Sequence, residues 1–116
     1  MEPDASLEPM HALLARLPPP VQATMVRMYR DALGEQLALV RAALDGSDAA
    51  ALQATAHKIA GSAAMMQDRE LSLAARAIEA AAVETDLPRA GEGWQQLQDR
   101  ALATLAGLAS RYPQPG

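Results

Sequence analysis

Histidine is the side chain in this sequence best suited to chemistry. The chain holds two, His11 and His57, and no cysteine, so thiolate nucleophiles, cysteine zinc sites and disulfides are absent. An exposed imidazole is substantially uncharged near neutral pH and can act as a nucleophile, a general base or a metal ligand. His57 is the informative one, because it lies within Ala56-His57-Lys58-Ile59-Ala60-Gly61-Ser62. What surrounds it decides among these kinds of chemistry.

The helical neighbours of His57 are small. On a helix the residues three and four positions away are Gln53, Ala54, Ala60 and Gly61, and three of these have one side-chain carbon or none. A glycine inside a helix costs roughly 1 kcal/mol relative to alanine, and this segment otherwise uses alanine freely. Access to the imidazole ring is the simplest explanation for Gly61. The spacing therefore predicts a histidine that a partner molecule can approach.

The same neighbours argue against other kinds of site. None is a carboxylate, serine or cysteine, so a hydrolase would need a carboxylate or serine brought to His57 from another helix. No second histidine follows at four residues and no carboxylates cluster on this face, so no metal site is predicted. Lys58 is rotated by about 100° from His57 and is interpreted as a solvated surface charge. His11 is expected to be an ordinary surface residue.

The elements that must position His57 are helices. Alanine and leucine dominate, aromatic residues make up 3% of the chain, and apolar residues recur with helical spacing. We expect an all-α fold with helices over about 7–17, 20–44, 48–66 and 68–84, and a fifth containing residues 94–112. Short connections favour an antiparallel up-down four-helix bundle with a short extra N-terminal helix. Residues 1–116 are expected to form one domain, with 113–116 as an unstructured tail.

Several details of these helices are also predicted. The buried stripe of the third helix is expected to be Leu52, Ala56, Ile59, Ala63 and Met66, which turns His57 to the edge of the bundle. Met25 and Met28 of the second helix are expected to face the core of the bundle. Ser47 and Asp68 are expected as the N-caps of the third and fourth helices. Pro88 should keep Leu87 out of the fifth helix.

The net charge and apolar pattern narrow the cellular setting. Ten basic residues against fourteen acidic ones give a net charge of −4, which argues against a nucleic-acid partner. No apolar run is long enough to cross a membrane, and the acidic start Met1-Glu2-Pro3-Asp4 lacks the features of a signal peptide. A cytoplasmic protein without a membrane partner is therefore expected.

The segment from Ala56 to Ala64 resembles the signature of histidine-containing phosphotransfer domains of bacterial phosphorelays, His-x-[Leu/Ile]-Lys-Gly-Ser/Ala. The resemblance implies that His57 is the phosphoacceptor, that Gly61 clears space beside it and that Ile59 anchors the same turn in the core. Ala60 stands where the family has lysine. Lys58 lies two positions before that lysine and on a different side of the helix, so the two positions are not equivalent.

The resemblance also implies a function. His57 would take a phosphoryl group from a receiver-domain aspartate and pass it to another receiver, so the chain would be a carrier rather than an enzyme. Partners would be response-regulator receivers or a hybrid histidine kinase, and the chain would bind no cofactor, because magnesium belongs to the receiver. Docking is expected around the histidine. The expected support residues are Gly61, Ala60, Lys58 and Ser62, and the docking face is Gln53, Ala54, Ala60, Gly61, Ala64 and Met65. The alternative is a helical adaptor or anti-regulator that docks a receiver or kinase without phosphotransfer, which Ala60 supports.

Overall fold

The computed structural model describes residues 5–113, which form helices and turns and contain no strand. The all-α prediction is confirmed over this range. The predicted tail falls mainly on residues 114–116, which lie outside the described residues. A short 3₁₀ turn, η1, precedes five α-helices. Their bounds are η1 Ala5–Leu7, α1 Glu8–Ala15, α2 Pro19–Asp45, α3 Ala49–Met65, α4 Arg69–Val83 and α5 Leu87–Arg111.

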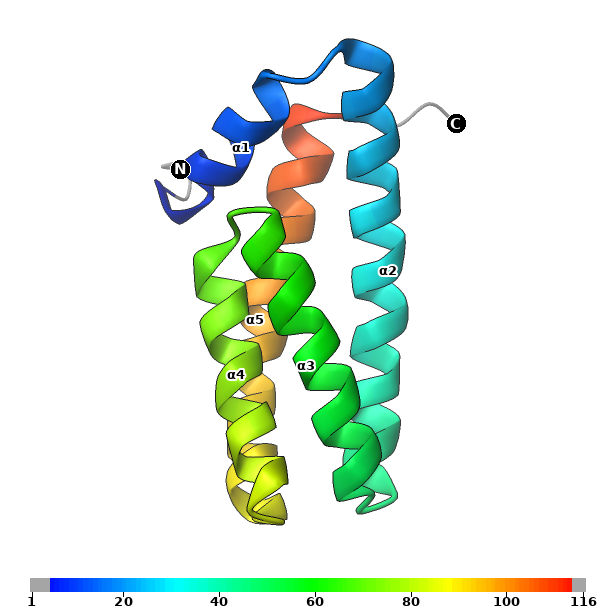
Figure 1. The fold of residues 1–116 in the computed structure, drawn as a ribbon, viewed down its shortest axis with the longest axis vertical. Coiled ribbons are helices and arrows are strands. Elements are labelled where there is room, and N and C mark those ends of the chain that lie inside the picture. Colours follow the sequence, from blue (N-terminus) through cyan, green and yellow to red (C-terminus); the bar gives the residue numbers. More distant parts are fainter. Residues whose placement is uncertain (1–4, 114–116) are drawn as a thin grey trace.

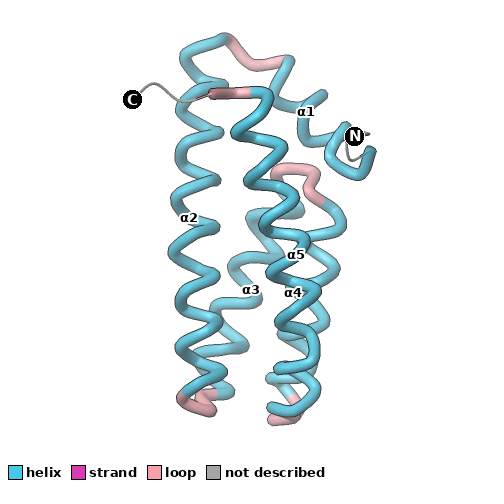
Figure 2. The backbone as a smooth tube through the Cα atoms, turned by 180° about the vertical axis from the view of Figure 1, so that it is seen from behind, coloured by secondary structure: helices cyan, strands magenta, loops and turns pink. Residues whose placement is uncertain are grey.

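The four longer helices form a bundle. Figure 1 shows α2, α3, α4 and α5 standing along the long axis of the molecule, with α1 lying across one end. Figure 2 shows the same arrangement from behind, with the turns gathered at the two ends. Helix α3 packs most extensively against α4, α4 also packs against α5, and α2 contacts both α3 and α5. Helix α3 therefore has a partner on each side, and one edge of it remains free.

The predicted stripe of α3 is buried, and the prediction for α2 is partly wrong. Every stripe residue of α3 from Leu52 to Met66 lies in the core. On α2, however, Met25 is only half-buried and Met28 is 62% exposed. The core side of α2 instead runs through Val26, Tyr29 and Leu33, which lie three and four residues apart. The apolar stripe is therefore offset from the methionines, because Val26 and Tyr29 share the helical face of Leu33.

Three junctions between helices repeat one backbone pattern. A residue with left-handed φ follows each of α2, α3 and α4: Ser47 at 52°, Gln67 at 61° and Thr85 at 56°. An aspartate comes next, and its N–H donates to the carbonyl five residues earlier, which closes the end of the preceding helix. The prediction of Ser47 as N-cap is therefore wrong. Ser47 occupies the left-handed turn position, and Asp48 caps α3 by accepting from the N–H of Ala51 at 3.0 Å.

Asp68 stands at the same place in its junction and is the N-cap residue of α4, as the sequence predicted. Its side chain, however, makes no capping hydrogen bond to the helix. It is buried, and its Oδ2 accepts from the Tyr29 hydroxyl at 2.8 Å and from the Thr104 hydroxyl at 2.7 Å. Burial raises the pKa of Asp68, against the opposing effect of these two hydrogen bonds and of Arg100. The cluster ties the start of α4 to α2 and α5.

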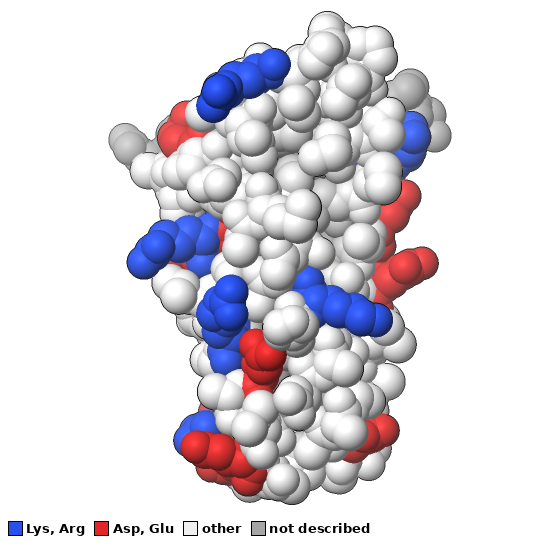
Figure 3. All heavy atoms as spheres, viewed as in Figure 1, with Lys and Arg blue, Asp and Glu red and all other residues white. Residues whose placement is uncertain are grey.

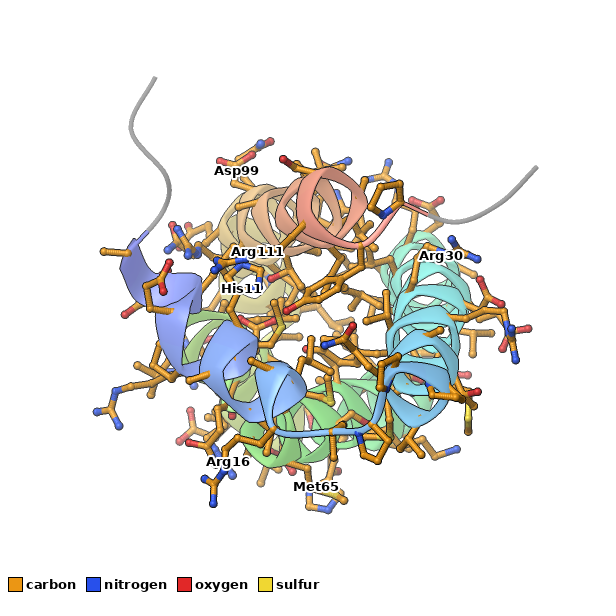
Figure 4. All side chains as sticks on the ribbon, turned by 90° about the horizontal axis from the view of Figure 1, so that it is seen from above. His11, Arg16, Arg30, Met65, Asp99 and Arg111 are labelled. Atoms are coloured by element: carbon orange, nitrogen blue, oxygen red, sulfur yellow. The ribbon has the colours of Figure 1, made fainter. Side chains whose placement is uncertain are left out.

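Helix α1 closes one end of the bundle over a buried histidine. The expectation that His11 is a surface residue is wrong, because its relative exposure is 7% and its Nδ1 has no hydrogen-bond partner. The ring centroid of His11 lies 5.8 Å from that of Tyr112. Burial lowers the pKa of His11, and the nearby Arg111 lowers it further, against the opposite effect of Glu8. Figure 4 looks down on this end and shows His11 and Arg111 together. His11 therefore helps to dock α1.

The start of α5 also differs from the prediction. Leu87 is the first residue of the helix, and Pro88 occupies its second position. The first turn of a helix leaves its N–H groups without intrahelical partners, so proline is tolerated there. Asp86 caps the turn by accepting from the N–H of Arg89 at 3.1 Å. The cap and the proline together allow α5 to begin at Leu87, two residues after Thr85.

Candidate functional site

His57 projects from the free edge of α3. Its side chain is 70% exposed, whereas its neighbours Ala56 and Ile59 are buried. This matches the predicted orientation, because a step of one residue turns a side chain by about 100° around the helix. The core stripe therefore holds α3 in place while the imidazole ring faces solvent.

Glu79 of α4 is the partner of His57. Its Oε2 lies 2.7 Å from Nδ1 of the imidazole, and its side chain is 20% exposed. The residues three and four positions from His57 on its own helix include no carboxylate, so Glu79 could not be found from the sequence around His57. Glu79 is 22 residues away, and the packing of α3 on α4 brings it there. One signal was available: Glu79 follows the buried Ile78 on α4, just as His57 follows the buried Ala56 on α3.

The contact with Glu79 assigns the two ring nitrogens different roles. An ionised carboxylate only accepts hydrogen bonds, so in a neutral ring the proton belongs on Nδ1. Nε2 then carries the lone pair. Nε2 is therefore the nucleophilic nitrogen, and the hydrogen bond at Nδ1 fixes the orientation of the ring.

The space around His57 is open. A shallow hollow of about 560 Å³ is lined by Ala50, Gln53, Ala54, His57, Lys58 and Glu79. A Cβ built at Gly61 would meet no other atom within 4 Å. The hollow contains no serine, cysteine or second histidine, so the carboxylate that a hydrolase would need is present but the hydroxyl or thiol is not. Among residues 5–113 no group of three or more side chains of the metal-binding types comes together.

The other predicted site residues divide into exposed and buried ones. Those that lie on the surface beside His57 are Gln53, Ala54, Lys58, Gly61, Ala64 and Met65. Figure 4 shows Met65 pointing away from the bundle, and its exposure is 79%. Ser62 is half-buried. These positions form a continuous strip along the free edge of α3.

Ala60 is the exception. It was expected on the docking face, but it is 1% exposed, and its carbonyl accepts from the Ser72 hydroxyl at 2.9 Å. The packing of α4 against α3 covers this position, so its inclusion in the docking face is corrected. Ala60 instead lies between α3 and α4, where its carbonyl links the two helices through Ser72.

The sequence around this histidine matches a known protein family. The sequence model of the Hpt domain matches residues 24–110, which span α2 to α5 and include both His57 and Glu79. The chain belongs to the Hpt domain family. Hpt domains are phosphocarrier modules that work with receiver domains and histidine kinases in two-component phosphorelays, so this domain belongs to signal transduction by histidine phosphotransfer. Comparison with curated proteins and with solved structures gave no match.

The matched range leaves α1 outside the family region. Within residues 5–113 of this Hpt domain, no helix combines the length and the apolar character that a membrane span requires. The site described above lies wholly inside the matched range.

Proposed function

We propose that His57 is the phosphoacceptor of this Hpt domain and shuttles a phosphoryl group between receiver domains. The observation that carries the proposal is the contact between Glu79 and Nδ1, which leaves Nε2 free on an exposed ring. The open position at Gly61 gives a partner access to that nitrogen. The His57 side chain is 70% exposed and its hydrogen bond to Glu79 uses Nδ1, so Nε2 is available to a phosphoryl group.

The proposed step is a displacement at phosphorus. The lone pair of Nε2 attacks the phosphorus of a receiver's aspartyl phosphate, a P–N bond forms, and the P–O bond to the aspartate breaks. The aspartate carboxylate leaves with the electron pair. The ring keeps its proton on Nδ1 and becomes positively charged, and the carboxylate of Glu79 balances that charge. The reverse sequence delivers the group to another receiver aspartate.

The partner supplies the rest of the site. The strip of exposed residues along α3 is the proposed docking face for receivers, or for the receiver of a hybrid kinase. It comprises Gln53, Ala54, Gly61, Ala64 and Met65. Ser62 is proposed to support it from the half-buried side. A divalent magnesium ion is expected on the receiver, where it would neutralise phosphoryl charge. The polar side chains that line the hollow are one imidazole, one carboxylate, one lysine and one glutamine, too few ligands for a metal site, so this chain is proposed to bind no metal or cofactor.

We also propose the order and direction of the four long helices. The short turns that follow α2, α3 and α4 support an antiparallel up-down order of the four helices. We treat the chain as one domain, acting as a carrier without catalysis of its own, in the cytosol where receivers are found.

The test is phosphoryl transfer itself. The protein would be incubated with a panel of phosphorylated receiver domains and magnesium, with His57→Gln as the matched control. We expect an acid-labile, base-stable label on the wild type and none on His57→Gln, while both bind receivers equally. Binding without any label on the wild type would contradict the proposal and favour the docking-only adaptor.

A further inference from the structure

A phosphoryl group on His57 would need a positive charge, and the cation that α3 offers, Lys58, lies on the side of His57 away from Gly61. The group carries about two negative charges near neutral pH, and charge-assisted hydrogen bonds are the strongest that a protein can offer it. Ala60, one turn after His57, is buried against Ser72 and has no charge to give. The neighbouring helix α4 is the other element that can bring a cation to this edge.

Arg76 is placed on the correct face of α4. It precedes Glu79 by three residues, and side chains three residues apart on a helix are neighbours, with Cβ atoms about 5–6 Å apart. Because Glu79 contacts Nδ1 of His57, Arg76 stands one turn along α4 from the imidazole. Side chains lean toward the start of their helix, which brings Arg76 over the part of α3 that follows His57.

A second hollow shows which part of α3 Arg76 faces. Arg76 lines a depression of about 300 Å³ together with Ala64 and Ser72. Ala64 follows Gly61 by three residues on the open edge of α3, and a Cβ built at Gly61 would meet no side chain within 4 Å. Arg76 therefore lies beside the turn of α3 that follows His57.

Arg76 also has no ion pair with any residue in the range 5–113, although it is exposed. Two other exposed arginines are paired, Arg41 with Asp45 at 3.3 Å and Arg89 with Glu84 at 2.9 Å, and so are less available to a phosphoryl group. Figure 3 shows basic side chains on both sides of an acidic one over the middle of α3 and α4. The face around His57 therefore holds a cation that the fold does not use.

We propose that Arg76 binds the phosphoryl group on His57 and takes the place of the lysine that this chain lacks at position 60. The inference rests on the proposed function of His57. The planar guanidinium can donate two parallel N–H groups to two phosphoryl oxygens, which a single ammonium cannot do in a fixed geometry. Lys58 is the competing cation, since it lines the hollow on the other side of His57 from Gly61.

The test uses a donor that needs no receiver. Phosphoramidate would label His57, with its P–N bond breaking and ammonia leaving, and the ³¹P NMR signal of the phosphohistidine would be followed against pH. A nearby cation favours the fully ionised phosphoryl group, so Arg76→Ala should raise the midpoint of its last ionisation by about half a pH unit. Arg76→Lys should restore part of that shift, and Arg41→Ala, which removes an arginine on α2, should produce none.

Equal midpoints for Arg76→Ala and Arg41→Ala would overturn the inference, and so would a larger shift for Lys58→Ala than for Arg76→Ala. A wild-type His57 that phosphoramidate does not label would overturn it as well. Failure of the proposed function is read separately, as a chemically phosphorylated protein that transfers nothing to any receiver. Circular dichroism of each variant would show that the exposed substitutions leave the helices intact.

Discussion

At the scale of single residues, His57 and Glu79 form a pair whose two effects can be separated. The carboxylate of Glu79 accepts from Nδ1 and thereby fixes which ring nitrogen carries the proton. It also places a negative charge beside a ring that would become positive in the proposed phosphorylation of Nε2. The first effect needs only an acceptor, whereas the second needs the charge.

Substitution of Glu79 separates the two effects. Glu79→Gln keeps an acceptor oxygen but removes the charge, so we expect phosphohistidine to accumulate about two- to fivefold less at equilibrium with a phosphorylated receiver. Glu79→Ala removes both and should lower the level further. Nitrogen NMR of the neutral His57 ring should show the Nδ1–H form in the wild type and in Glu79→Gln, and a mixture in Glu79→Ala. Equal phosphohistidine levels in all three proteins would show that Glu79 has no part in the site.

At the scale of elements, α3 combines a buried stripe with an open edge, and Gly61 lies on that edge. The glycine is expected to weaken the helix, because glycine is less favourable than alanine in a helix interior. Nothing in the fold requires it: a Cβ there would contact no atom within 4 Å. The cost to α3 is therefore consistent with a requirement for access rather than for packing.

Gly61→Ala should accordingly stabilise the protein. We expect the free energy of unfolding to rise by about 0.5–1 kcal/mol, through the helix propensity of alanine. Urea unfolding followed by circular dichroism measures this. Gly93→Ala in α5 is the comparison, because its Cβ would lie 3.0 Å from Cγ1 of Ile78 and the gain should be smaller. A loss of stability in Gly61→Ala would mean that the glycine has a packing role after all.

At the scale of the whole molecule, Asp68 joins three helices through one carboxylate. It accepts from Tyr29 of α2 and Thr104 of α5 at the start of α4, while its second oxygen, Oδ1, has no partner. A buried, incompletely bonded carboxylate disfavours its own ionisation, which is why the pKa of Asp68 is raised. Ionisation of Asp68 therefore opposes folding.

The pH dependence of stability follows from that direction. Because the folded pKa of Asp68 exceeds the unfolded one, its favourable contribution is complete below about pH 4 and is lost as the pH rises through the folded value. We expect the free energy of unfolding of the wild type, relative to Asp68→Asn, to fall as the pH is raised above about 4, the ordinary pKa of an aspartate. Urea unfolding of both proteins across this range measures the difference. A difference that stays constant with pH would contradict the raised pKa.

The sequence by itself determined the features that depend on local spacing. Helical periodicity placed Leu52, Ile59 and Ala63 in the core and turned His57 outward, because a helix repeats every 3.6 residues wherever it is found. The small neighbours of His57 and the unusual Gly61 were also visible in the sequence. The motif behind the resemblance to phosphotransfer domains is the segment from Ala56 to Ala64, and the family match confirmed the resemblance.

Only the tertiary structure decided which helices face one another. The contact of Glu79 with His57, the burial of Ala60 and the inward turn of Asp68 each depend on the register between helices. That register is set by turn geometry and by packing of the whole core, which no window of neighbouring residues contains. His11 was misjudged for the same reason: the cover that buries it is formed by α1 and the distant end of α5.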